Sequence, residues 1–102
     1  MRFIGLDIHL DFCEIAIWEN GKVRSAGRVQ TSPRGLDVLA ESLRPDDEVV
    51  LEATGNALAI ARRIEPHVAR VVVAVRKELR AITEAKVKTD RLASTGSRKY
   101  VR

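Results

Sequence analysis

Three consecutive valines, Val71–Val73, place the strongest limit on how this chain can fold. They lie in an unbroken strand-like run over residues 70–75, which is typical of a parallel β-strand covered on both faces. A parallel strand needs a neighbouring strand and a crossover connection, which is usually a helix. The chain has 102 residues, enough for one domain with a real core. The run therefore predicts a single α/β domain.

The first thirty residues predict an antiparallel meander of three strands. Residues 2–9 are mostly apolar, and Gly5 within them would let another backbone come close. Residues 12–18 alternate in the manner of a half-buried strand. Asn20-Gly21 is a preferred pair for a two-residue hairpin turn, and a third strand over residues 22–30 follows it.

The rest of the chain alternates between helical and strand patterns. Ser32 and Pro33 suit the start of a helix whose apolar side chains recur at helical spacing up to about residue 43. A short strand over 48–53, a helix over 57–65 that Pro66 closes, the valine strand and a helix over 77–87 follow. The predicted order is βββαβαβα, a mixed sheet in which two parallel strands join the meander through helical crossovers. We expect the first strand to be central, with the strand over 48–53 beside it.

The composition and the single cysteine indicate a protein of the cytoplasm. Hydrophobic residues make up 45% and charged residues 31% of the chain, as in ordinary soluble domains. No apolar run approaches the roughly 18 residues that span a membrane, and Asp7 interrupts the apolar start as no signal peptide would. Cys13 cannot form an internal disulfide, which fits a reducing compartment. We expect no membrane partner, and a Cys13 that packs beside a strand.

The net charge of +4 is concentrated near the C-terminus. Residues 1–85 are nearly neutral, whereas residues 86–102 contain one acid, Asp90, and six bases: Lys86, Lys88, Arg91, Arg98, Lys99 and Arg102. Such a basic segment suggests a polyanion such as nucleic acid as a partner. A solvated chain end is the competing interpretation.

Two acids follow neighbouring strands of the predicted sheet. Asp7 is near the end of the first strand and Glu52 is at the end of the strand over 48–53. Adjacent carboxylates repel each other unless a cation lies between them, and carboxylate oxygens suit Mg²⁺ or Mn²⁺. Paired cations of this kind can stabilise both oxygens of a phosphodiester displacement. The spacing fits equally a structural role, with Asp7 bonded to a turn and Glu52 facing solvent.

Three blocks of sequence together resemble a known family. They are Gly5-Leu6-Asp7-Ile8-His9, Leu51-Glu52-Ala53-Thr54-Gly55-Asn56 and Ala85-Lys86-Val87-Lys88-Thr89-Asp90-Arg91. In this order they resemble the N-terminal domain of DEDD transposases of bacterial insertion sequences, the IS one-ten type, now understood as RNA-guided recombinases. The resemblance covers residues 1–92. Residues 93–102 depart from it, and we expect them to form a disordered basic tail.

The resemblance implies an RNase H-like fold of the Holliday-junction-resolvase (RuvC) kind. It also implies Mg²⁺- or Mn²⁺-dependent phosphodiester chemistry in DNA transposition and recombination. Three of the family's four acids correspond to Asp7, Glu52 and Asp90, which would be the catalytic and metal-binding residues. The fourth acid would stand at position 93, where this chain has Ala93. DNA, a guide RNA and further copies of the chain are the implied partners.

Basic residues near these acids are candidates for contact with nucleic acid. His9 would touch a substrate phosphate or orient Asp7, and a merely packed histidine is the equal alternative. The positions of Lys86, Lys88 and Arg91 beside Asp90 suit contact with the backbone of DNA or guide RNA. In contrast, the basic residues at 76, 77 and 80 are expected on solvated helix faces.

The turn after Glu52 is expected to begin the next helix. Thr54 and Asn56 would cap it, and Gly55 would take a positive φ. The helix N-terminus would also attract a phosphate.

Because one of the four acids is missing, we expect a truncated, inactive remnant of a DEDD transposase. A metal-independent DNA- or RNA-binding module derived from such a transposase is the alternative. A third hypothesis is an actin-like ATPase fold, whose first hairpin also begins with Gly-x-Asp, although that fold needs two lobes and a far longer chain.

Overall fold

The computed structural model describes the backbone of residues 1–91 and the side chains of residues 1–85. The elements follow one another in the predicted order, with a short 3₁₀ helix added before the last strand. The strands are β1 (Phe3–Ile8), β2 (Phe12–Glu19), β3 (Lys22–Gln30), β4 (Glu48–Glu52) and β5 (Arg70–Ala74). The helices are α1 (Pro33–Ser42), α2 (Ala57–Ile64), η1 (Glu65–His67) and α3 (Arg76–Arg91).

The five strands form one mixed sheet in the order β3-β2-β1-β4-β5. The pairs β1–β2 and β2–β3 are antiparallel, and β1–β4 and β4–β5 are parallel. The central place of β1 and its pairing with β4 are therefore confirmed. Leu6 of β1 lies opposite Leu51 of β4, so the carboxyl ends of these two strands are neighbours.

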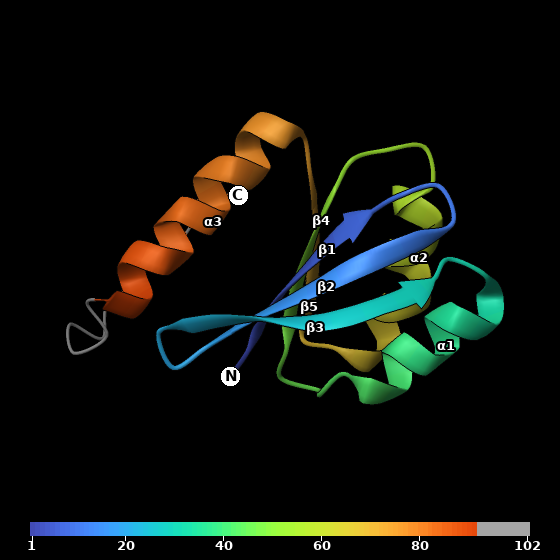
Figure 1. Ribbon diagram of the computed structural model, residues 1–102, viewed down its shortest axis with the longest axis horizontal. Coiled ribbons are helices and arrows are strands. Elements are labelled where there is room, and N and C mark those ends of the chain that lie inside the picture. The colour runs from blue at the N-terminus through green and yellow to red at the C-terminus, as the bar shows by residue number, and fades with distance from the viewer. Residues whose placement is uncertain (92–102) are drawn as a thin grey trace.

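The two faces of the sheet are covered unequally (Figure 1). Helices α1 and α2 pack on one face, and Ile4, Leu39, Leu51, Ile60 and Ile64 are fully or almost fully buried there. Helix α3 lies on the other face, where Leu79, Ile82 and Ala85 are only partly buried. Most of the core therefore lies between the sheet and the first two helices.

The edge position of β5 was not expected from its valine run. The run suggested a strand covered on both faces, and α2 and α3 contact β5 from opposite faces, but β5 is the outermost strand of the sheet. All three valines are partly exposed as a result, and only Val71 and Val73 pack against the core. None of the helices among the described residues is long and apolar enough to cross a membrane.

Local signals in the sequence explain the first hairpin and the first helix. Asn20 and Gly21 both have positive φ, at 55° and 77°, as the expected two-residue turn requires. The Ser32 hydroxyl accepts a hydrogen bond of 3.1 Å from the Gly35 amide, which caps α1. Cys13 is fully buried in the core as expected, and this burial raises the pKa of its thiol.

The turn between β4 and α2 differs from the expectation. Gly55 does not have a positive φ. Asn56 stands at the N-cap position but its side chain makes no capping hydrogen bond; instead the Thr54 carbonyl accepts from the Ala57 amide at 3.0 Å. The backbone therefore closes this turn without the Asn56 side-chain cap that the sequence predicted. Helix α3 also runs to Arg91, four residues beyond the predicted end.

A buried ion pair joins the beginnings of β1 and β4. Arg2 donates from Nε to Asp47 Oδ1 at 3.0 Å and from Nη2 to Asp47 Oδ2 at 2.8 Å. Asp47 also accepts from the Arg44 amide at 2.7 Å. Burial would raise the pKa of Asp47, but these hydrogen bonds outweigh it and hold the pKa below its usual range. This pair joins β1 to β4 at the end of the sheet opposite to Asp7 and Glu52.

Candidate functional site

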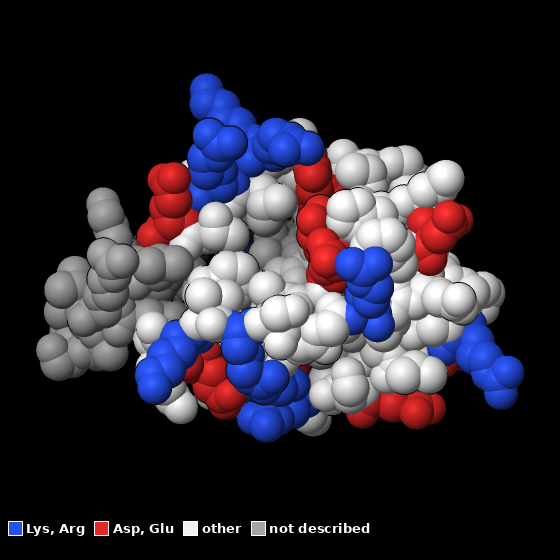
Figure 2. All heavy atoms as spheres, viewed as in Figure 1, with Lys and Arg blue, Asp and Glu red and all other residues white. Residues whose placement is uncertain are grey.

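An open groove of about 680 Å³ lies between α3 and the adjoining sheet face. Figure 2 shows it as a hollow with charged side chains of both signs around its rim. We call it the α3 groove. It is lined by Gly5, Leu6, Asp7, Glu14, Ile15, Ala16, Trp18, Val23, Arg24, Ser25, Val50, Glu52, Arg76, Leu79, Arg80 and Thr83.

Small residues and one large ring make the apolar part of the α3 groove. Gly5 lies opposite Ala16 in the β1–β2 register, and Trp18 is two residues further along β2. A Cβ on Gly5 would stand 2.9 Å from Cζ3 of Trp18, closer than real contacts allow. The group that Gly5 allows to come close is thus the Trp18 ring, whereas the sequence suggested another backbone. Phe3 holds that ring from the side, at 5.5 Å between centroids.

Asp7 and Glu52 both line the α3 groove. Their preceding residues, Leu6 and Leu51, are direct partners in the parallel β1–β4 pair. This register brings together the two acids that the sequence placed at one end of the sheet. Their surroundings differ, because the Asp7 side chain is 66% exposed whereas that of Glu52 is 22% exposed.

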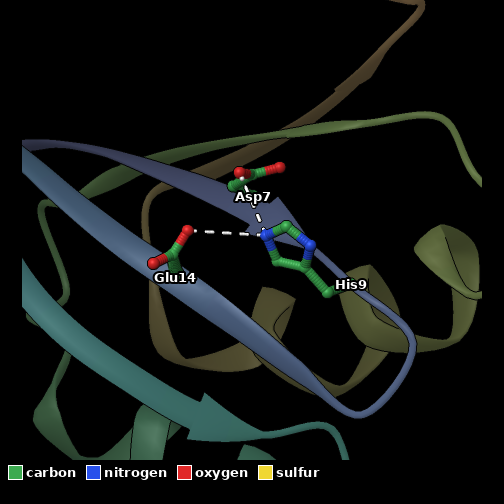
Figure 3. Close-up of side chains that lie close together, drawn as sticks. All are labelled: Asp7, His9 and Glu14. Carbon is green, nitrogen blue, oxygen red and sulfur yellow. Dashed lines mark ion pairs between the residues drawn. The ribbon is translucent and has the colours of Figure 1, made fainter.

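A third acid, Glu14, joins Asp7 and His9 (Figure 3). Glu14 lies opposite Asp7 in the antiparallel β1–β2 pair. The Nε2 atom of His9 lies 3.2 Å from Asp7 Oδ2 and 3.4 Å from Glu14 Oε1. One potential ligand atom from each residue lies within 4.8 Å of the others, a spacing that could hold a metal ion. This geometry fits the orientation of Asp7 by His9, and the stacking of His9 on Phe12, at 4.5 Å between ring centroids, fits equally the alternative of a packed histidine.

Sequence reasoning did not single out Glu14. The signal was present, because the alternation of β2 places it on the same strand face as Ala16 and Trp18, away from the buried core. Its pairing with Asp7 depends on the length of the connection between β1 and β2, which the sequence pattern did not fix.

Arginines already pair with two of these acids. Arg76 Nε lies 3.3 Å from Glu52 Oε2, and Arg28 Nη2 lies 3.1 Å from Glu14 Oε2. Arg76 was expected on a solvated helix face, and its side chain is 77% exposed. Because α3 follows β5 directly, Arg76 also reaches Glu52 at the end of the groove where the acids lie. Arg80, one turn further along α3, also lines the groove.

The remaining predicted site residues lie in the last turns of α3. The helix backbone includes Lys86, Lys88, Asp90 and Arg91, whose side chains lie outside the described residues. Asp90 comes fourteen residues after Arg76, which corresponds to roughly 21 Å along a straight helix axis. In this conformation α3 does not carry the Asp90 backbone to the Glu52 end of the groove. Ala93 and the predicted tail over 93–102 also lie outside the described part of the chain.

Comparison with known proteins shows a shared fold. No family model and no curated protein matches the sequence. A protein of unknown function with an actin-like ATPase fold from Bacteroides thetaiotaomicron has a TM-score of 0.57 and 14% identity, over 71% of this chain and 32% of that one. Pelota from Archaeoglobus fulgidus has a TM-score of 0.51 and 17% identity, over 91% of this chain and 35% of its own.

The chain spans about a third of the length of each of these proteins. Neither of them is described as a transposase. At this level of identity the likeness concerns the fold alone. The protein is an α/β domain with a mixed sheet of five strands, and most of it is similar in fold to part of one protein with an actin-like ATPase fold.

Proposed function

We propose that this chain carries the metal-binding core of an RNase H-like (RuvC-like) domain, of the kind that acts on phosphodiester bonds in DNA in the DEDD transposases that its motifs resemble, and that it is a truncated, inactive remnant of such a transposase. The observation that carries the proposal is the meeting of Asp7 and Glu52 in one groove, at the ends of adjacent parallel strands. Ligand sites of open α/β sheets lie at this end of the strands. Glu14 adds a third carboxylate opposite Asp7.

The side chains present fit a hard divalent cation. Carboxylate oxygens are preferred ligands of Mg²⁺ and Mn²⁺, and Asp7, Glu14 and Glu52 supply them within one groove. A bound cation would stabilise the charged oxygens of a phosphodiester displacement. His9 would orient the Asp7 carboxylate, and Arg80 on the opposite wall would attract substrate phosphate.

A metal-independent DNA- or RNA-binding module is the second candidate. Two observations favour it. Glu52 and Asp7 already have basic partners in Arg76 and His9. In addition, the α3 backbone carries Asp90 away from them, and position 93 holds alanine in place of the family's fourth acid. The basic residues of α3, Lys86 and Lys88 among them, would then hold the phosphate backbone.

Metal titration separates the two candidates. We expect Mn²⁺ added to the chain to give a calorimetric binding signal that Asp7→Ala removes. Glu41→Gln, which changes an exposed acid of α1 on the other side of the sheet, should leave the signal unchanged. Mg²⁺-dependent cleavage of labelled branched DNA, also lost in Asp7→Ala, would support the nuclease and contradict its inactivity.

The binding module gives the opposite pattern. It requires no metal signal and no cleavage, with DNA and RNA binding that persists in EDTA and weakens steeply as salt rises. A chain that binds neither metal nor nucleic acid would contradict both candidates.

A further inference from the structure

Four side chains at the acid end of the α3 groove contact one another in a closed set. The His9 and Phe12 rings stack at 4.5 Å between centroids with planes 22° apart. The Arg28 guanidinium lies 4.2 Å from the centroid of the Phe12 ring. Glu14 lies within ion-pair distance of both His9 and Arg28. We call this set the stacking cluster.

The stacking cluster holds the Arg28 guanidinium at two points. The Phe12 ring lies against the guanidinium and Glu14 accepts from its Nη2, so two contacts in different directions hold it. The Arg28 side chain is nevertheless 61% exposed. A planar cation supported in this way presents an open surface to solvent, next to the acids of the groove. A simple cross-strand ion pair with Glu14 would not need the Phe12 contact.

We propose that this surface binds an unpaired nucleobase of a single-stranded nucleic acid. A guanidinium plane is a common stacking partner for nucleobases, and stacking tolerates any base because every base has a π-face. Bases inside a duplex already stack on their neighbours, which favours a single strand. Because the cluster is ordered without a ligand, little side-chain entropy remains to be lost on binding. The inference rests on the proposed function in one respect, that a nucleic acid reaches the adjoining acids.

Two oligonucleotides isolate the contribution of the base. One is a fluorescently labelled thymidine decamer, and the other is a decamer of the same length with abasic sites, which keeps the phosphates and lacks the bases. Fluorescence anisotropy in EDTA gives the affinity of each. We expect the thymidine decamer to bind at least about fivefold more tightly, since stacking of one base contributes roughly 1–3 kcal/mol. Equal affinities, or binding of neither, would overturn the inference.

Three variants assign that preference to the cluster. Arg28→Lys keeps the charge and removes the plane, so it should abolish the thymidine preference while the abasic affinity stays. Phe12→Leu, which removes the supporting ring, should reduce the preference as well. Arg63→Lys is the matched control, because Arg63 also pairs with an acid, Asp37, at 2.9 Å, but joins α2 to α1. If Arg28→Lys lowered the affinity for both decamers equally, Arg28 would contact only the phosphates, and the inference would be refuted.

The same measurement separates this inference from the proposed function. It uses no metal, and Asp7→Ala should retain the thymidine preference because the base would stack on Arg28, whereas the Asp7 side chain contacts His9. A chain that shows the preference but neither binds metal nor cleaves DNA would leave the base site standing and defeat only the nuclease. Cleavage of DNA without the thymidine preference would support the nuclease and refute the base site.

Discussion

At the scale of single residues, the contact between Arg2 and Asp47 is a buried ion pair whose disruption should be costly. Asp47 is completely buried, and its carboxylate is matched by the guanidinium of Arg2 and the amide of Arg44. A buried charge that loses its partner is much more costly than an exposed one. The two residues are 45 positions apart and join β1 to the start of β4.

Replacement of Arg2 by methionine should therefore destabilise the fold strongly. We expect Arg2→Met to lower the free energy of unfolding by about 3–5 kcal/mol, measured by urea denaturation. Arg44→Met is the control, since it retains the backbone amide that Asp47 uses and loses an exposed contact with Glu19 and only the charge attraction of Arg44 to Asp47. Equal losses in the two variants would show that the pair is not the source of the effect.

The lowered pKa of Asp47 predicts that the fold loses stability in acid. A carboxyl whose pKa is lower in the folded state stabilises the fold fully above its unfolded pKa of about 4, and loses that contribution as the pH falls through the folded pKa. Thermal melts between pH 7 and pH 2 should show the native chain losing its advantage over Asp47→Asn below about pH 4. An advantage that stays constant over this range would contradict the assignment.

Gly5 gives a second prediction at this scale. A methyl group there would press on the Trp18 ring, which Phe3 already holds from the side. We expect Gly5→Ala to cost about 1–3 kcal/mol and to shift the fluorescence of Trp18, the single tryptophan of the chain. Gly55→Ala is the matched control, because a Cβ at Gly55 meets nothing within 4 Å. An unchanged stability of Gly5→Ala would mean that the ring moves freely.

At the scale of elements, the two helix starts look alike in sequence and differ in structure. Ser32 caps α1 through its hydroxyl, whereas the Asn56 side chain makes no such bond at the start of α2. We expect Ser32→Ala to lower the free energy of unfolding by about 1 kcal/mol and Asn56→Ala to change it far less. Denaturation curves measure both, and an equal effect would show that Asn56 caps α2 in solution.

The elements were predictable wherever a local rule decides. The Asn20-Gly21 turn, the Ser32 cap and the alternation of β2 each depend on residues close in sequence, and the strands and helices appeared where expected. The edge position of β5 depends on the order of strands in the sheet, which the run Val71–Val73 does not encode. For the same reason the Arg2–Asp47 pair was not predicted, since only the packed fold brings these residues together.

At the scale of the whole molecule, the core is one-sided. The inward side chains of α2 are buried, whereas Leu79, Ile82 and Ala85 of α3 are only partly buried beside an open groove. We expect the amide hydrogens of α3, up to Ala85, to exchange with solvent faster than those of α2. Hydrogen exchange followed by mass spectrometry measures this, and equal protection would show that α3 is firmly docked.

The candidate site was predictable in part at this scale. Asp7 and Glu52 were predicted from their positions at the ends of two strands, and the parallel register of β1 and β4 brings them into one groove. Glu14 and Arg76 were missed because a hairpin register and the direction of a helix determine their positions. The role of Asp90 stays a prediction, because its side chain lies outside the described residues.

The position of β3 also affects how two copies of the chain meet. Almost all of its nine residues are exposed, and it forms an open edge of the sheet. Such an edge can pair with the same edge of another copy and start aggregation. Lys22, Arg24 and Arg28 would then face like charges, and Gly27, with a φ of 90°, bends the strand at a break in its register with β2. Charge and backbone shape therefore both disfavour pairing of β3 with another copy.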